Sequence, residues 1–151
     1  MTFKQKSKDQ IRQHEGCLYV IYSDHLGFKT FGVGHFITSK DVEFGQPIGT
    51  PVTSERVEDV FDKDWEVSLE TAKRLVGNFD SHPENVQLVL VNMAFNLGYN
   101  RLKKFQKFIG AVTIRDYQGA ALEMMDSKWY TQVGNRSKEL VKLMENPLDE
   151  I

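Results

Sequence analysis

The stretch that decides the fold of this chain is Glu15-Gly-Cys-Leu-Tyr-Val-Ile-Tyr-Ser-Asp24-His-Leu-Gly27-Phe-Lys-Thr30-Phe-Gly32-Val-Gly34-His35. Its first part is rich in β-branched and aromatic residues, which favour strands. Turn-forming residues follow, and then an alternating stretch, so the segment 18–37 is predicted to form a β-hairpin or a small meander. Gly32 and Gly34 give the returning strand little bulk, which indicates close approach of its backbone to another part of the molecule.

Helical patterns lie on both sides of this segment. Residues 2–15 predict a helix that ends at Gly16. Apolar residues recur at helical spacing over 53–76, with Thr53 as the expected N-cap and an acidic first half. We expect this long helix to connect two lobes. Residues 38–52 contain two glycines and two prolines and are expected to form an irregular loop.

The rest of the chain predicts a helical lobe. The nearly apolar stretch 86–97 is expected to be its buried central helix, capped by Gly98. A basic amphipathic segment is expected at 101–109 and a last helix at 135–145. Thr113 and Asp116 resemble a capping signal ahead of a helix over 117–125.

The predicted fold class is therefore α+β and mainly helical. A small lobe with β-structure occupies about residues 16–55. The connecting helix spans about 53–76. The larger helical lobe spans about 77–151 and also includes the N-terminal helix 2–15.

Composition excludes several other classes of protein. The 151 residues include 19 basic and 21 acidic side chains, a net charge of −2 that gives no support for nucleic-acid binding. A hydrophobic content of 40% suits a globular chain, and the single Cys17 cannot form an internal disulfide. No apolar run reaches the length of a membrane span, so membrane insertion is not expected. The basic N-terminus lacks a following apolar stretch, so we expect synthesis in the cytoplasm without a signal peptide.

Three side chains in the fold-deciding segment could carry chemistry. Glu15 falls at a helix end, Asp24 in the hairpin turn and Thr30 on the returning strand. Two carboxyl groups in different environments are the minimal equipment for glycoside hydrolysis, one protonated as an acid and the other ionised. The bare pair alone does not separate catalytic carboxyls from ordinary surface carboxylates. No metal-ligand spacing or phosphate loop is present, so neither a metal nor an organic cofactor is expected.

The segment as a whole closely resembles the catalytic segment of the phage-type lysozymes, glycoside hydrolase family 24. The shared pattern is Glu-Gly, eight intervening residues between Glu and Asp, five between Asp and Thr, and then Gly-x-Gly-His. Further stretches resemble the interlobe helix, the cleft-facing helix and the C-terminal signature of the T-even phage lysozymes. These stretches are 53–65, Asn92-Met-Ala-Phe95-Asn96-Leu-Gly98, and Ser127-Lys-Trp129-Tyr130-Thr-Gln132-Val-Gly-Asn135-Arg136. The resemblance implies a lysozyme-like two-lobed fold over nearly the whole chain.

The resemblance also implies roles for individual residues. Glu15 would be the general acid, and Asp24 with Thr30 would hold and activate water on the opposite face of the sugar. That arrangement implies an inverting enzyme, with about 6.5–9.5 Å between the carboxyls. Further roles are implied for six residues: Phe36, Phe95 and Asn96 in substrate binding, His35 paired with Asp64 as structural support, and Arg136 near the acid.

The implied substrate is the β-1,4 bond between N-acetylmuramic acid and N-acetylglucosamine in bacterial peptidoglycan. The leading interpretation is a monomeric phage endolysin that lyses the host cell and needs a holin for its release. One alternative is a lytic transglycosylase that ends the reaction in an internal anhydro sugar. The other is a non-catalytic wall-binding or virion module with the same fold.

Overall fold

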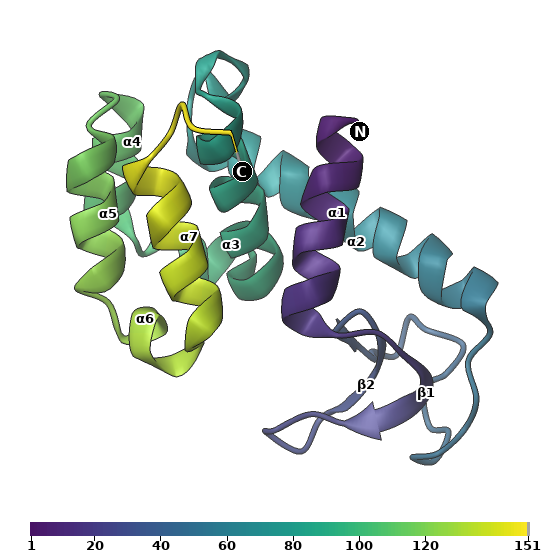
Figure 1. The fold of residues 1–151 in the computed structure, drawn as a ribbon. Helices are drawn as coiled ribbons and strands as arrows, with labels where there is room; N and C mark the ends of the chain where they lie inside the picture. Colours follow the sequence, from purple (N-terminus) through teal and green to yellow (C-terminus); the bar gives the residue numbers. More distant parts are fainter. Residues whose placement is uncertain (151) are drawn as a thin grey trace. The chain divides into compact units, whose positions relative to one another are not determined.

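The computed structural model describes residues 1–150 and shows the predicted α+β, mainly helical fold (Figure 1). The chain forms two compact units. The β unit is the segment Lys8–Glu66, and the helical unit is Met1–Ser7 together with the chain from Val67 onward. None of the helices within the described part of the chain is both long and apolar enough to cross a membrane.

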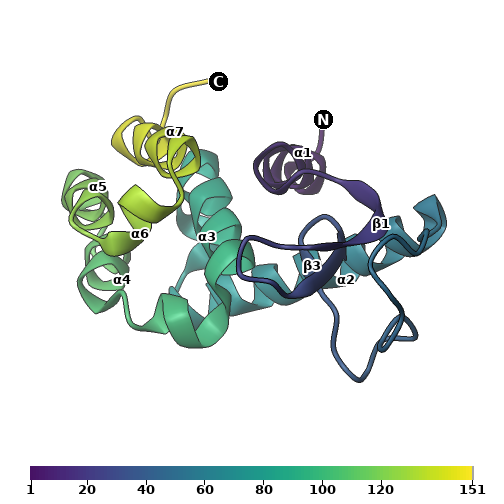
Figure 2. The ribbon, with the colours of Figure 1, turned by 90° about the horizontal axis from the view of Figure 1, so that it is seen from below.

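The β unit contains the predicted meander. Its strands are β1 (Leu18–Ser23), β2 (Lys29–Gly32) and β3 (His35–Phe36), antiparallel and in that order. Figure 1 labels β1 and β2, and Figure 2 labels β1 and β3. Tyr22 lies opposite Thr30 on the neighbouring strand, and Thr30 lies opposite Phe36. Side chains of directly opposed residues lie on the same face of a sheet. Tyr22, Thr30 and Phe36 therefore share one face.

The other face of the sheet packs against the start of α2 (Ser54–Leu75). Ile21 and Phe31 are fully buried there, next to Val57 and Val60 of the helix. Gly32 permits the close approach predicted from its lack of a side chain, because a Cβ atom there would lie 3.0 Å from Cγ1 of Val57. One face of the sheet thus belongs to the core.

The helices and the loop that border the sheet match their predictions closely. Helix α1 (Phe3–Glu15) ends where Gly16 turns to φ 76° and donates its N–H to the Arg12 carbonyl, at 2.8 Å. The loop 38–52 is irregular, and its last residues bond to β1. Thr53 caps α2 as predicted, because its Oγ1 accepts the N–H of Arg56 at 3.1 Å.

The helical unit is built around α3 (Glu84–Lys103), which contains the predicted buried central helix. Gly98 leaves the helical conformation, with φ 74° and ψ 171°, as expected of a capping glycine. The chain then resumes a helical course up to Lys103. The basic amphipathic segment expected at 101–109 is divided between two helices, because α3 ends at Lys103 and α4 (Gln106–Thr113) begins after a break.

The remaining helices are α5 (Tyr117–Met125), α6 (Lys128–Gln132) and α7 (Asn135–Glu145), and Figure 1 shows α4, α5 and α7 side by side. Asp116 caps α5 by accepting the N–H of Gly119 at 2.9 Å. Thr113 takes no part in this cap, because its hydroxyl donates to the Ile109 carbonyl inside α4. Neither α6 nor the 3-10 turn η1 (Phe79–Ser81) was predicted, since elements this short show no apolar periodicity.

Replacing Phe31 by alanine should lower the free energy of unfolding by about 3–4 kcal/mol, because a fully buried ring is removed from the core of the β unit. Urea denaturation followed by circular dichroism measures this loss. Phe44→Ala is the matched control, since that ring is 61% exposed and should cost less than about 0.5 kcal/mol. Equal losses in the two variants would contradict the assignment of the core.

Candidate active site

Glu15 is the last residue of α1 and lies against the turn between β2 and β3. Gly34 in that turn has φ 62°, a conformation that favours glycine. A Cβ atom at residue 34 would overlap the carboxylate of Glu15. The second glycine of the Gly-x-Gly motif is therefore the point where the strand backbone makes room for this carboxyl group.

Asp24 organises the turn between β1 and β2. Its Oδ1 accepts the N–H of Leu26 at 2.9 Å and the N–H of Phe28 at 2.8 Å. Its own carbonyl accepts the N–H of Gly27 at 3.0 Å. Aspartate is favoured in such turns because its side chain replaces a backbone acceptor. The carboxylate is therefore held in one orientation.

Thr30 is buried on β2, and its hydroxyl donates to the carbonyl of Phe28 at 3.0 Å. A carbonyl oxygen can only accept, so the position of the hydroxyl hydrogen is fixed. The lone pairs of Oγ1 remain as acceptors. Asp24 and Thr30 are thus linked through the same backbone residue, Phe28.

Tyr22 is a site residue that the sequence did not single out. Burial raises the pKa of its phenol, and the nearby negative charges of Glu15 and Asp24 raise the pKa further. Tyr22 also lies directly opposite Thr30 in the sheet. The charges of Glu15 and Asp24 are therefore both felt at Tyr22, which is the neighbour of Thr30 on the adjacent strand. Nothing in its spacing distinguished Tyr22 from a strand-forming aromatic residue.

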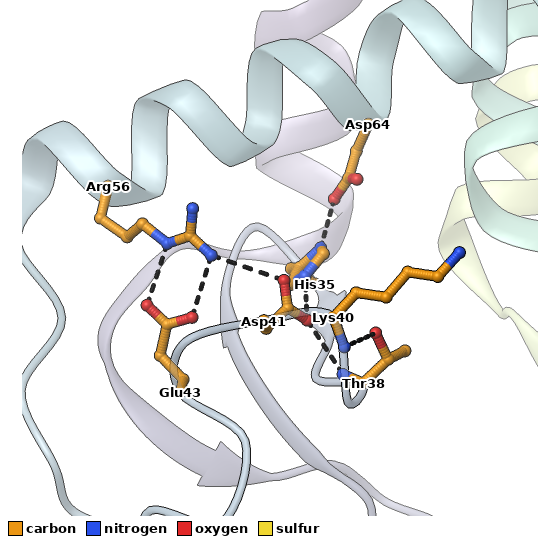
Figure 3. A network of polar contacts seen from close by, with 7 residues as sticks. All are labelled: His35, Thr38, Lys40, Asp41, Glu43, Arg56 and Asp64. Atoms are coloured by element: carbon orange, nitrogen blue, oxygen red, sulfur yellow. Dashed lines mark hydrogen bonds and ion pairs between the residues drawn. The ribbon is translucent and has the colours of Figure 1, made fainter.

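His35 is held between two carboxylates next to this site (Figure 3). Its Nδ1 lies 2.7 Å from Oδ2 of Asp64 on α2, the contact expected from sequence. Its Nε2 lies 3.0 Å from Oδ2 of Asp41, which was not expected. The network continues to Arg56, which binds both oxygens of Glu43 and lies 3.4 Å from Oδ1 of Asp41.

The charges in this network stabilise one another. Burial opposes the charge of His35, but Asp64 and Asp41 together outweigh burial and raise the pKa of His35 above its usual 6.5. Burial likewise opposes ionisation of Asp41, but the Thr38 N–H, His35 and Arg56 lower its pKa overall. The Arg56 guanidinium lowers the pKa of Glu43.

The other predicted site residues belong to the helical unit. Arg136 on α7 is buried, and its Nε donates to Oδ1 of Asn92 at 2.8 Å. Asn96 on α3 accepts the indole N–H of Trp129 at 2.7 Å, so its amide oxygen is already used within the unit. Phe95 precedes it on α3 and is half-buried.

A pocket of about 580 Å³ opens in the helical unit beside Trp129. Phe105 and Phe108 supply apolar walls, and the rim is mostly basic, with Arg101, Lys104, Lys107 and Lys128. None of Glu15, Asp24 and Thr30 lines this pocket. We therefore do not assign this pocket as the reaction centre, despite its size.

Comparison of this chain with known proteins identifies its family. The phage lysozyme family matches residues 12–145. The chain belongs to the phage lysozyme family. The matched range includes every site residue predicted from sequence.

Individual members differ in how much of their length corresponds to this chain. The probable T4-type lysozyme 2 of Dictyostelium discoideum is 28% identical over 91% of this chain and 92% of its own length. The peptidoglycan hydrolase gp36 of Pseudomonas phage phiKMV is 28% identical over 94% of this chain but 15% of its own length. The pre-baseplate central spike protein Gp5 of Enterobacteria phage T4 is 25% identical over 90% of this chain and 27% of its own length.

Replacing Gly34 by alanine should displace the Glu15 carboxylate and destabilise the protein by about 2 kcal/mol, since the new Cβ meets that carboxylate and the backbone is strained at positive φ. A crystal structure and urea denaturation of the variant measure the two effects. Gly45→Ala is the matched control, because φ is 86° there and a Cβ would meet open space. Equal destabilisation in both variants, with Glu15 unmoved, would contradict the proposed close approach.

Replacing His35 by asparagine should lower the free energy of unfolding by about 2 kcal/mol near pH 5.5, because a hydrogen-bonded charge between two carboxylates is lost. The raised pKa of His35 means that its stabilisation is complete below about pH 6.5 and is lost as the pH rises through the folded-state pKa. The lowered pKa values of Asp41 and Glu43 mean that their stabilisation is lost on acidification below about pH 4.

The difference between wild type and the His35 variant should therefore be largest between about pH 4.5 and 6.5 and smaller at about pH 8.5. Urea denaturation across this range measures it. His25→Asn removes an exposed histidine and serves as the control. A difference that does not change with pH would show that the charge on His35 contributes nothing to stability.

Proposed function

We propose that this protein hydrolyses the β-1,4 bond between N-acetylmuramic acid and N-acetylglucosamine in bacterial peptidoglycan, with inversion at the anomeric carbon. Membership in the phage lysozyme family and similarity to a peptidoglycan hydrolase support a glycoside hydrolase that acts on the cell wall. The assignment of the bond and the mechanism rests on the β unit. There the negative charges of Glu15 and Asp24 both raise the pKa of Tyr22, and Thr30 lies opposite Tyr22 in the sheet.

Glu15 is the general acid in this proposal. Its proton passes to the glycosidic oxygen as the bond to the anomeric carbon breaks, so the leaving sugar departs as an alcohol. The turn at Gly34 leaves room for this carboxyl group at the end of α1, where a side chain at residue 34 would overlap it. Close packing restricts the orientations of the acid, which reduces the reorganisation needed for proton transfer.

Asp24 and Thr30 hold the attacking water in this proposal. The two N–H donors of the turn bind Oδ1 of Asp24, so we assign Oδ2 to one hydrogen of the water. The Thr30 hydroxyl donates to the Phe28 carbonyl, so its oxygen accepts the other hydrogen. The water then directs a lone pair at the anomeric carbon. The water oxygen adds there as a hydroxyl group that keeps the hydrogen held by Thr30, and the hydrogen held by Asp24 passes to that carboxylate as a proton.

The other predicted site residues take supporting roles in the proposal. Phe36 and Phe95 contact the sugars, and His35 with Asp64 supports β3 beside the acid. Asn96 reaches the sugar through its Nδ2 group, because its oxygen accepts from Trp129. Arg136, oriented by Asn92, keeps the role near the acid that the family resemblance implies.

We further propose that the protein lyses a phage host from within. A monomer made in the host cytoplasm would reach the wall through a holin. Residues 101–142 carry nine basic and four acidic side chains, so attraction to the anionic wall would be local and weakened by salt. Two alternatives remain, a lytic transglycosylase and a non-catalytic wall-binding or virion module. Analysis of the products tests the first, and the activity of the wild type and of a Glu15 variant tests the second.

Replacing Glu15 by glutamine should reduce the rate of clearing of a cell-wall suspension by at least about a thousandfold, because the amide cannot protonate the leaving oxygen. The fall in turbidity at 450 nm measures the rate, and circular dichroism checks that the variant is folded. Glu70→Gln alters an exposed glutamate on α2 and should clear at the wild-type rate. Unchanged clearing by the Glu15 variant would refute the assignment, and an inactive wild type would favour the non-catalytic module.

Mass spectrometry of the wild-type digest separates hydrolysis from transglycosylation. Hydrolysis adds one water to the new reducing end, whereas a 1,6-anhydro end has the mass of the sugar without it. We expect the heavier product, since Asp24 and Thr30 hold the attacking water in this proposal, and their bonds to the backbone of the turn support it. Anhydro products as the main species would overturn the hydrolytic mechanism but would leave Glu15 as the general acid.

A further inference from the structure

We infer that Phe28 positions the two water-holding residues and, with Phe36, forms an aromatic surface that binds a sugar ring of the glycan. This inference rests on the proposed function and concerns a residue that the family motif leaves unassigned. It joins two separate features of the same residue, the backbone hydrogen bonds and the exposed ring.

The backbone of Phe28 bonds to both partners of the attacking water. Its N–H donates to Oδ1 of Asp24 at 2.8 Å, and its carbonyl accepts the Thr30 hydroxyl at 3.0 Å. The same carbonyl also accepts the N–H of Asp24 at 2.9 Å. A shift of residue 28 would therefore move the carboxylate and the hydroxyl together.

The side chain of Phe28 is exposed next to these bonds. Its ring meets the ring of Phe36 edge to face, with 5.2 Å between centroids, and each residue is 49% exposed. Phe36 lies opposite Thr30 in the sheet, so the aromatic pair borders the hydroxyl that holds the water. Two large apolar rings exposed side by side to solvent indicate a surface that binds a ligand.

The position of the pair indicates what covers it. A pyranose ring has an apolar face of C–H groups, and aromatic rings supply rigid contact area at little cost in conformational entropy. A sugar that reaches Asp24 and Thr30 lies beside these rings, because the Phe28 backbone bonds to both residues and Phe36 lies opposite Thr30. The occupant is therefore an N-acetylhexosamine unit of the strand being cleaved.

The two features together predict coupling between sugar binding and catalysis. A sugar packed on the Phe28 ring restrains residue 28, and this restraint fixes the acceptors of the water. Phe36 contributes to the same surface, but the backbone bonds to the Asp24 carboxylate and the Thr30 hydroxyl are made by Phe28. Loss of the two rings should therefore have different kinetic effects.

Steady-state kinetics on a soluble peptidoglycan tetrasaccharide test this inference. Phe28→Ala should raise KM about tenfold and lower kcat about fivefold, because binding and positioning are both weakened. Phe36→Ala should raise KM with kcat nearly unchanged. Phe28→Tyr keeps the ring and should stay within about twofold of wild type in both constants. Phe44→Ala is the matched control, an exposed phenylalanine of the same unit with wild-type kinetics expected.

Binding without turnover gives a second readout that does not depend on catalysis. NMR titration of the tetrasaccharide into Glu15→Gln should show about tenfold weaker binding once Phe28→Ala is added. Unchanged KM, kcat and binding in the Phe28 variants would overturn the inference, while wild-type hydrolysis would leave the proposed function intact. A raised KM with unchanged kcat would reduce Phe28 to a sugar contact and refute positioning. If Phe28→Ala does not fold, Phe28→Leu takes its place in the same measurements, because leucine keeps apolar bulk without the ring.

Discussion

The imidazole of His35, held between Asp64 and Asp41, is the interaction on which the geometry of the β unit depends. It bonds the short strand β3 to α2 on one side and to the loop after β3 on the other. Its chain neighbours are Gly34, which receives the Glu15 carboxylate, and Phe36, which lies opposite Thr30. A fixed ring at residue 35 therefore fixes the acid and the sugar-facing side of the sheet at the same time. A two-residue strand would otherwise have few backbone bonds to hold it.

The two faces of the sheet differ because successive side chains along a strand point to opposite faces. Phe31 faces the core, and its neighbour Thr30 turns to the side of the carboxylates. The core contacts stiffen the backbone whose other side carries the polar groups. These polar groups in turn satisfy one another or bond to backbone, as Thr30 does with Phe28 and Asp24 with the turn. Buried polar side chains are tolerated when their hydrogen bonds are made within the fold.

Sequence reasoning predicted the parts whose signals are local. The meander, the long helix from Thr53 and the central helix follow from apolar period and capping chemistry, and each is present close to its predicted bounds. The division of the basic segment 101–109 between α3 and α4 was not predicted, since no glycine or proline marks the break at Lys104 and Phe105. The network of Arg56 with Glu43 and Asp41 could not be predicted, because an irregular loop has no period from which side-chain directions follow. The role of the Phe28 backbone was equally inaccessible, since every residue has an N–H and a carbonyl and only the folded turn shows where they point.

The span of sequence that supplies the proposed machinery has a consequence for folding. Glu15, Asp24, Thr30 and Phe36 lie within 22 consecutive residues, and the side-chain hydrogen bonds of Asp24 and Thr30 in the turn join positions two to four residues apart. Contacts of short sequence separation form quickly, because they close small loops at low entropic cost. The catalytic turn of this chain is therefore expected to take shape early in folding, ahead of the long-range packing of helices that supports it. Substitutions in distant helices would then lower the stability of the protein before they disrupted the hydrogen bonds of the turn.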